Sequence, residues 1–274
     1  MVKIQDIKEH TRAYYNKNNI LNIDANPKTI KGNKKGYLTA VLYLSPARLS
    51  GVELCAYRSK GCTDICLNVS GRGKFNTTQQ ARLKKTNYYL NDTNHFMANL
   101  IRRVQNFIKL ANKRGLIPVV RLNGTSDIPF EDIKIKVRKE VFSPSYGGYV
   151  KCTVENNIFE LFPNIQWYDY TKYPLNKRTI NHNYDLTFSL AEHNYKRAVK
   201  YLDTKSGRVS AVFSHNIPKS YKGYKVVNGD DSDLRFLEPK GVIVGLKFKG
   251  NKKDLKKGIK SGFVIYNNDK KGVK

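Results

Sequence analysis

Tyr37-Leu-Thr-Ala-Val-Leu-Tyr-Leu44 is an unbroken run of β-branched, aliphatic and aromatic residues, and it decides the fold. Such a run predicts a buried strand. A loop rich in Gly, Ser, Arg and Cys follows over residues 45–75. Thr77 and Thr78 are then placed to cap a helix that runs to Leu90. The chain therefore starts with a strand, a cysteine loop and a helix, in that order.

Apolar periodicity predicts more helices and strands in the rest of the chain. Apolar residues recur at i, i+3 and i+4 from Phe96 to Ala111, which predicts a helix, and Gly115 is placed to end it. Short buried runs predict strands over 116–122, 165–170, 185–190, 209–213, 224–227 and 242–246. Weaker patterns predict helices over 154–162 and 194–202.

Alternating buried strands and helices are typical of an α/β fold. We expect one domain over residues 37–274 with a mostly parallel sheet, of which a partial or complete (β/α) barrel is one form. Some intervals near the C-terminus are too short for a crossover helix, so part of that region is expected to be antiparallel. Residues 1–36 are expected to form a polar extension, and the domain includes the Lys-rich residues 240–274.

Charge predicts a polyanionic partner. The 274 residues include 50 Lys and Arg against 22 Asp and Glu, a formal net charge of +28, which is more than solubility needs. DNA or RNA fits best, because basic side chains gain affinity for a phosphate backbone by releasing its counterions. We expect phosphate contacts from Lys84, Lys85, Arg102 and Arg103. The alternative is that the Lys content reflects compositional drift.

Composition and hydropathy argue against a disordered chain and against a chain that spans a membrane. A content of 40% hydrophobic and 11% aromatic residues is enough to build a core, so the composition is not that of a disordered chain. No 18 apolar residues follow one another, and the N-terminus lacks the apolar run of a signal peptide. We therefore expect an intracellular protein with no membrane partner.

Three cysteines predict a metal site. Cys55, Cys62 and Cys66 lie in the loop after the first strand with the spacing C-x6-C-x3-C. Thiolates hold Zn or iron–sulfur clusters, and three of them leave one metal position open. The spacing matches neither the paired C-x2-C of zinc ribbons nor that of ferredoxins, so a structural Zn with a fourth ligand and unligated buried cysteines both stay open. Cys152 is expected to be a core residue rather than a fourth ligand.

Polar residues follow five of the predicted strands. They occur in the segments Arg121 to Asp127, Trp167 to Lys172, Ser189 to Asn194, Ser214 to Asn216 and Asn228 to Asp233. Ligands of parallel α/β folds gather at the carboxyl ends of strands, so a shared site is expected there. Asp127, Asp169 and Glu192 are the predicted acid–base or substrate-orienting groups. The alternatives are a helix cap at Asp127 and a solvated or Mg²⁺-binding loop over residues 230–233.

Several motifs resemble the bacteriophage family called gene product 88. They are Leu54-Cys-Ala-Tyr-Arg-Ser-Lys-Gly-Cys-Thr-Asp-Ile-Cys-Leu67, Gly71-Arg-Gly73, Arg121-Leu-Asn-Gly-Thr-Ser-Asp127, Tyr168-Asp-Tyr-Thr-Lys172 and Leu186-Thr-Phe-Ser189. The resemblance spans roughly residues 37–265. It implies a phage-encoded protein in the cytoplasm of the infected bacterial host, and it implies no mechanism.

A looser similarity is to radical S-adenosylmethionine enzymes, in which a three-cysteine loop after the first barrel strand binds a 4Fe-4S cluster. Cys55, Cys62 and Cys66 match that loop in number and placement, but those enzymes usually show C-x3-C-x2-C. By this analogy the cluster would hold S-adenosylmethionine, with Asn123 and Ser126 at a strand end that contacts the cofactor.

The leading hypothesis is an enzyme that acts on nucleic acid or a nucleotide at a cysteine-bound iron–sulfur cluster or Zn. One alternative is a non-catalytic DNA- or RNA-binding protein with a structural Zn. Another is a barrel-type base transglycosylase with a nucleophile such as Asp127. The sequence leaves the oligomeric state open.

Overall fold

The structure is a computed structural model that describes residues 11–15, 17–24, 26–143 and 148–267, with residues 139, 141–143 and 148–152 described as backbone only. Its strands are β1 (Leu21–Ile23), β2 (Tyr37–Leu42), β3 (Ile117–Arg121), β4 (Ile135–Ser143), β5 (Gly148–Asn156), β6 (Gln166–Thr171), β7 (Tyr184–Ser189), β8 (Arg208–Phe213), β9 (Ser220–Tyr221), β10 (Tyr224–Asn228), β11 (Ile243–Lys247) and β12 (Val264–Ile265). The α-helices are α2 (Pro27–Asn33), α3 (Lys60–Asp64), α4 (Asn76–Asn91), α5 (Thr93–Lys113), α6 (Ile158–Leu161), α7 (Tyr195–Asp203) and α8 (Lys252–Ser261). Single 3-10 turns are η1 (Leu67–Val69), η2 (Gly71–Lys74), η3 (Phe130–Asp132), η4 (Leu175–Lys177) and η5 (Arg235–Leu237).

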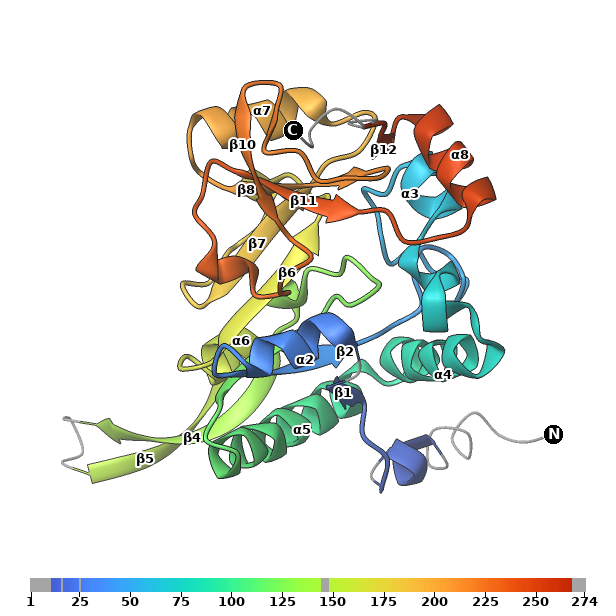
Figure 1. Cartoon of the computed structure of the whole chain (residues 1–274). Helices are drawn as coiled ribbons and strands as arrows, with labels where there is room; N and C mark the ends of the chain where they lie inside the picture. The colour runs from blue at the N-terminus through green and yellow to red at the C-terminus, as the bar shows by residue number, and fades with distance from the viewer. Residues whose placement is uncertain (1–10, 16, 25, 144–147, 268–274) are drawn as a thin grey trace.

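One large sheet organises the chain (Figure 1). Its strand order is β1-β2-β3-β6-β7-β8-β11-β10-β9, and β12 pairs with β8. The ladders from β2 to β10 along this order are parallel, whereas β1 and β9 pair antiparallel at the two edges. The order from β2 to β8 follows the chain, as in (β/α) barrels. The prediction of a mostly parallel α/β sheet with an antiparallel part is confirmed.

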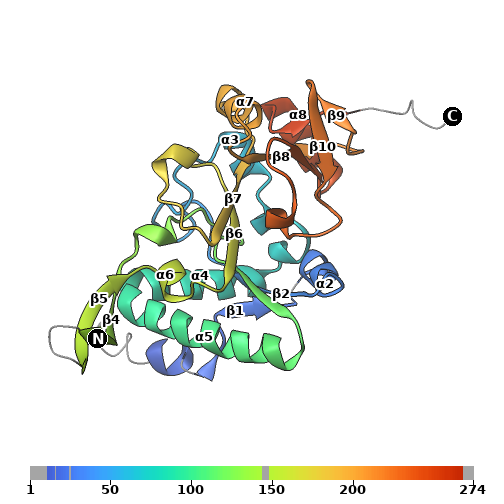
Figure 2. The ribbon, with the colours of Figure 1, turned by 90° about the vertical axis from the view of Figure 1, so that its left-hand side faces the viewer.

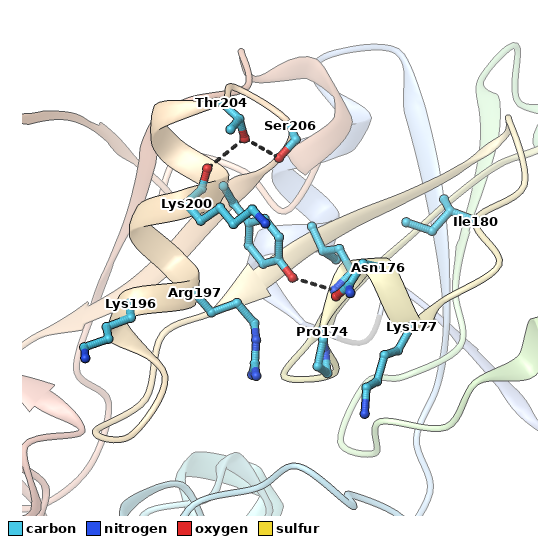
Figure 3. A pocket seen from close by; sticks show the side chains of 11 residues that line it. Pro174, Asn176, Lys177, Ile180, Lys196, Arg197, Lys200, Thr204 and Ser206 are labelled. Carbon is cyan, nitrogen blue, oxygen red and sulfur yellow. Dashed lines mark hydrogen bonds between the residues drawn. The ribbon is translucent and has the colours of Figure 1, made fainter.

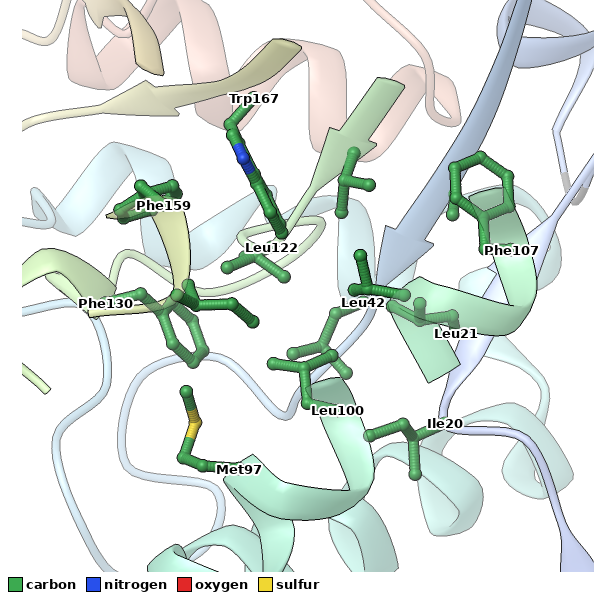
Figure 4. Packing of buried hydrophobic residues seen from close by; sticks show 14 of the residues in the cluster. Ile20, Leu21, Leu42, Met97, Leu100, Phe107, Leu122, Phe130, Phe159 and Trp167 are labelled. Atoms are coloured by element: carbon green, nitrogen blue, oxygen red, sulfur yellow. The ribbon is translucent and has the colours of Figure 1, made fainter. Parts of the chain in front are cut away.

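Helices α5 and α7 cover one face of the sheet. Figure 4 shows Met97 and Leu100 of α5 in the same apolar cluster as Leu42 of β2, Leu122 beyond β3 and Trp167 of β6. The apolar stripe predicted from Phe96 to Ala111 is the face of α5 that packs here, and Gly115 ends the turn after it with a φ of +65°. Helix α7 packs in the same way over β7, β8 and β11.

The segment after β10 covers the opposite face. Leu234 and Phe236 pack there against Val119 of β3 and Tyr168 of β6. Because both faces of the sheet are covered, side chains on both sides of a strand such as β2 are buried, which explains its continuous apolar run. Residues 38–42 are all fully buried. The two faces together leave the carboxyl ends of the strands as the place where loops can build a site.

Several expected elements differ from the structure. Residues 154–156 belong to β5, so the helix predicted over 154–162 is wrong except for α6. Helix α4 begins at Asn76, and its N-cap Phe75 makes no side-chain cap, so Thr77 and Thr78 are not caps. Strands β11 and β12 are parallel to β8 although short segments precede them, and only β9 and β10 form an antiparallel pair near the C-terminus. The direction of these strands is therefore decided by their pairing across the sheet and not by the length of the segments that precede them.

Two further features concern the periphery. Strands β4 and β5 form a separate antiparallel hairpin that projects from the sheet in both views (Figures 1 and 2). Within residues 1–36, β1 extends the main sheet and α2 packs on β2. No helix among the described residues is long and apolar enough to cross a bilayer.

Candidate functional site

The cysteine loop lies at the carboxyl ends of β2, β3 and β6. It leaves β2, forms α3, η1 and η2, and then enters α4. Ser59 caps α3, because its hydroxyl accepts the Cys62 N–H at 3.0 Å. Figure 1 shows α3 beside α8, so the C-terminal part of the chain closes over the helix that carries Cys62.

Two of the three sulfur atoms accept hydrogen bonds from the backbone, and the third lies near a cation. The N–H groups of Ala47 and Asn68 point at Cys55 Sγ (3.4 Å) and Cys66 Sγ (3.5 Å). Cys62 interacts with the ammonium of Lys172, the residue that follows β6. Donors around sulfur stabilise the thiolate, which is the form that binds metals. The three cysteines singled out in the sequence lie close enough to interact electrostatically with one another.

Burial governs the protonation of these thiols. It raises the pKa of Cys55 to about 12, and the charges of Asp127 and the other two thiols add to the shift. Burial also raises the pKa of Cys66. Without a bound cation these two thiols hold their protons at neutral pH, so metal binding would have to release them.

Among the described residues, no group of three or more His, Cys, Asp and Glu side chains is arranged to hold a metal ion. The donor set itself suits a metal or a cluster, since three soft thiols lie within electrostatic reach of one another. Binding would therefore require the sulfur atoms to move closer together.

Lys172 supplies the positive charge of the site. Burial lowers its pKa, but the charges of Cys62 and Asp127 and the hydrogen bond to Cys62 outweigh burial and raise it. Its ammonium lies 5.4 Å from the centre of the Phe263 ring. A second cation, Arg82 on α4, interacts with Cys66 and bonds to Asn68 Oδ1 at 2.6 Å. These cations offset the charge that bound thiolates would carry.

Asp127 lies next to this group. Its Oδ2 accepts the Lys172 N–H at 2.8 Å, and its Oδ1 lies 3.6 Å from the Arg178 guanidinium. Burial raises the pKa of Asp127. The helix-cap alternative is wrong, because the next helical turn is η3, whose N-cap is Pro129. A cavity of about 250 Å³ opens beside Asp127 between apolar and aromatic walls that include Leu54, Tyr89 and Tyr173.

Asp169 lies in β6, just after the ladder between β3 and β6 ends. It accepts the N–H groups of Leu122 (3.2 Å) and Asn123 (2.9 Å) and the Tyr184 hydroxyl (3.1 Å). Burial raises its pKa to about 7, against the opposing charge of Arg121. Asp169 thus holds the two strands at the point where the loop to Asp127 begins.

Asn123 and Ser126 organise that same loop. The Asn123 amide donates to Ile128 O at 2.9 Å, and its Oδ1 accepts the Ile128 N–H (2.8 Å) and the Ser126 hydroxyl (2.9 Å). Both residues are buried. Their side chains form the turn that presents Asp127.

Glu192, beyond β7, reaches the cysteine loop. Its Oε1 accepts the Gly61 N–H at 2.8 Å, at the start of α3. Its pKa is lowered: burial would raise it, but hydrogen bonds from Ser59 and Gly61 prevail. Glu192 therefore positions α3 from the end of the neighbouring strand.

The predicted phosphate contacts lie apart from this site. Lys84 and Arg102 are exposed on α4 and α5. Lys85 is buried, with its ammonium 3.3 Å from Ile20 O, and burial lowers its pKa to about 8. Arg103 donates to Asn18 O at 2.8 Å. Lys85 and Arg103 thus anchor the N-terminal segment.

The last two predicted strand ends do not join the cysteines. Asp230 pairs with Lys28 of α2 at 2.7 Å, and Asp233 pairs with Arg121 at 3.0 Å inside the fold. His215, after β8, bonds to Ser214. Cys152 lies on β5 in the projecting hairpin, and its side chain is outside the described part of the structure.

Sequence reasoning missed Arg178 altogether. Its guanidinium forms a buried pair with Glu131 and reaches Thr171 and Asp127. Glu131 lies in the short turn η3 and Arg178 directly follows η4, and neither segment has an apolar periodicity, so only their charge inside apolar surroundings could have marked them. Lys172 could have been marked, though only weakly, because it is the last residue of the polar segment Trp167 to Lys172 at a predicted strand end.

A family model described as gene product 88 matches residues 18–267. No curated protein and no solved structure was found to match. The comparisons therefore add no support to the similarity with radical S-adenosylmethionine enzymes.

Proposed function

The chain belongs to the gene product 88 family, and since that name states no activity, we propose a function from the cysteine site itself. We propose an enzyme of the infected bacterial cytoplasm in which Cys55, Cys62 and Cys66 hold an iron–sulfur cluster. Its substrate is a nucleic acid or a nucleotide. The observation that best supports this proposal is the position of the three thiols. They lie at the carboxyl ends of parallel strands, and each is beside a hydrogen-bond donor.

The ligand set favours a cluster over a structural Zn. A structural Zn is held by four protein ligands. Among the described residues, no His and no fourth Cys interacts with the three thiols, and the carboxylate that does, Asp127, faces the Arg178 guanidinium at 3.6 Å. Three thiolates leave a position open, and the cations of Lys172 and Arg82 suit a negatively charged cluster. When bound, a 4Fe-4S cluster would supply an open iron for S-adenosylmethionine and an electron for its cleavage.

The residues of the chain take separate roles in this proposal. Asp127 is the acid–base or substrate-orienting group, because it is buried, ionisable and next to a cavity. Asp169 and Glu192 are positioning residues, since their carboxylates bond to the backbone of the Asp127 loop and of α3. The net charge of +28 supports a phosphate-bearing substrate.

Elemental analysis and an absorbance spectrum of anaerobically purified protein test the proposal. Iron with acid-labile sulfide and broad visible absorption is the expected result. Stoichiometric Zn without iron would favour the DNA- or RNA-binding alternative. A metal-free protein that still exchanges a base would favour the transglycosylase with Asp127 as nucleophile.

A further inference from the structure

A larger cavity, of about 840 Å³, lies between the segment after β6 and helix α7. Figure 3 shows Lys177 of the segment and Lys196, Arg197 and Lys200 of α7 around it. All four side chains are exposed. The cavity therefore has a cationic rim built from two segments that lie on either side of β7 in the chain.

These four charges are not neutralised within the protein. No acidic residue lines the cavity. Among the described residues, none of the four cations has a carboxylate within salt-bridge distance, in contrast to Lys28, Lys60 or Arg208 elsewhere. Like charges around one cavity repel each other, and a bound anion relieves that repulsion.

The wall of the cavity is apolar and fixed. Pro174, Leu175 and Tyr201 line it, and the Tyr201 hydroxyl accepts the Leu175 N–H at 2.8 Å. This bond joins the segment to α7 at the wall of the cavity. An apolar wall beside cations suits a nucleotide unit, whose sugar and base pack while its phosphate is neutralised.

The same segment also builds the cysteine site. Lys172 interacts with Cys62, Arg178 lies 3.6 Å from Asp127, and Lys177 between them reaches the cavity. Helix α7 follows Glu192, which bonds to the start of α3. The cavity and the cysteine site thus share two strand-end segments.

We propose that this cavity binds the phosphodiester backbone of a nucleic-acid strand and leads that strand to the cysteine site. The choice of partner rests on the proposed function. The site differs from the α4 and α5 surface predicted from the sequence, where Lys85 and Arg103 are bonded to the N-terminal segment.

Two matched quadruple variants test the inference. The first, K177Q/K196Q/R197Q/K200Q, removes the rim of the cavity. The second, K84Q/R102Q/K109Q/K113Q, removes three Lys and one Arg from exposed positions of α4 and α5. The probe is fluorescent oligothymidine, titrated at two salt concentrations, with ATP as competitor. Circular dichroism and metal content are measured on the same samples.

The first variant should bind oligothymidine roughly tenfold more weakly than the second, and its salt slope should fall by about 0.7 for each phosphate that it no longer neutralises. If both variants bound oligothymidine equally weakly, the loss of net charge alone would explain the effect, and the inference would be overturned. Tight ATP binding without strand binding would assign the cavity to free nucleotides and overturn it too. Metal content is measured separately on the same samples. A protein without an iron–sulfur cluster would contradict the proposed function, but the comparison of strand binding between the two variants would still stand.

Discussion

Asp127 lies in the loop after β3 and Asp169 lies in the neighbouring strand β6. Both have a raised pKa because they are buried, yet their contacts give them different roles. Asp169 is surrounded by donors from β3 and from Tyr184. Asp127 Oδ1 accepts no hydrogen bond among the described residues, lies 3.6 Å from the Arg178 guanidinium, and has a cavity beside it. A buried carboxylate with an unsatisfied oxygen at a cavity is better suited to chemistry than one that is fully engaged.

Asp127→Asn should keep the fold and the metal but abolish activity. The amide oxygen can still accept the Lys172 N–H, so we expect a melting temperature within a few degrees of the parent. Loss of a general acid or base typically costs roughly 10²- to 10⁴-fold in rate. Mass spectrometry of nucleosides from infected cells would report the activity. An unchanged nucleoside profile with normal phage growth would remove Asp127 from the chemistry.

Asp169 should make the stability of the protein depend on pH. Its pKa of about 7 in the folded state lies above the ordinary value of ~3.9, so the folded chain retains a proton that the unfolded chain has released. The contribution of this group therefore favours folding at low pH and is lost as the pH rises from about 4 to about 7. Melting curves at pH 5 and pH 8 should show a smaller drop for Asp169→Asn than for the parent. An equal drop would mean that Asp169 is ionised throughout.

At the scale of elements, α3 depends on close packing against the C-terminal part of the chain. A Cβ on Gly61 would lie 2.5 Å from Ser261 Oγ, 2.7 Å from Phe263 Cβ and 3.1 Å from Glu192 Oε1. Only glycine therefore allows α3 to approach both α8 and the end of β7.

Gly61→Ala should displace α3, destabilise the protein and weaken metal binding through Cys62. Gly32→Ala is the control, because its Cβ would meet ordinary contacts of 3.6 Å or more inside α2. The helix propensity of Ala should stabilise that variant by up to ~1 kcal/mol. Thermal melting and metal content would be compared. A Gly61→Ala protein as stable and as metal-rich as the parent would contradict the assigned packing.

Elements with strong periodicity could be predicted from the sequence, and those made by distant contacts could not. The stripe of α5 and the apolar runs of β2, β3 and β6 are local signals, and they lie within a residue or two of their predicted places. The β4–β5 hairpin lacks a comparable run, and α4 begins without the capping side chain expected for it. The three cysteines were identified from spacing, whereas Arg178 and Glu131 meet only through folding.

At the scale of the whole molecule, a buried ionic network joins the middle of the sheet to the segment after β10. Arg121 pairs with Asp233 at 3.0 Å, and the hydroxyls of Tyr168 (3.3 Å) and Tyr170 (3.4 Å) also donate to Asp233. The Arg121 guanidinium lies 4.8 Å from the centre of the Tyr170 ring. This network holds the covering segment against the face of the sheet opposite α5.

Arg121→Met should destabilise the protein by about 3–5 kcal/mol, because it leaves Asp233 buried without its cation. Asp233→Asn should cost less, since its amide oxygen can still accept from the tyrosines. Urea unfolding of both single variants and of the double variant gives the coupling energy. Additive destabilisation would show that the two side chains do not interact.

The central claim is that three cysteines share one metal centre, and metal retention by single cysteine variants tests it most directly. Cys55→Ala, Cys62→Ala and Cys66→Ala would each be purified anaerobically beside Cys152→Ala, and iron, zinc and visible absorbance would be measured per chain. The three loop variants should lose the metal about equally, whereas Cys152→Ala should retain it. Full metal in all three loop variants, or loss only in Cys152→Ala, would contradict the account.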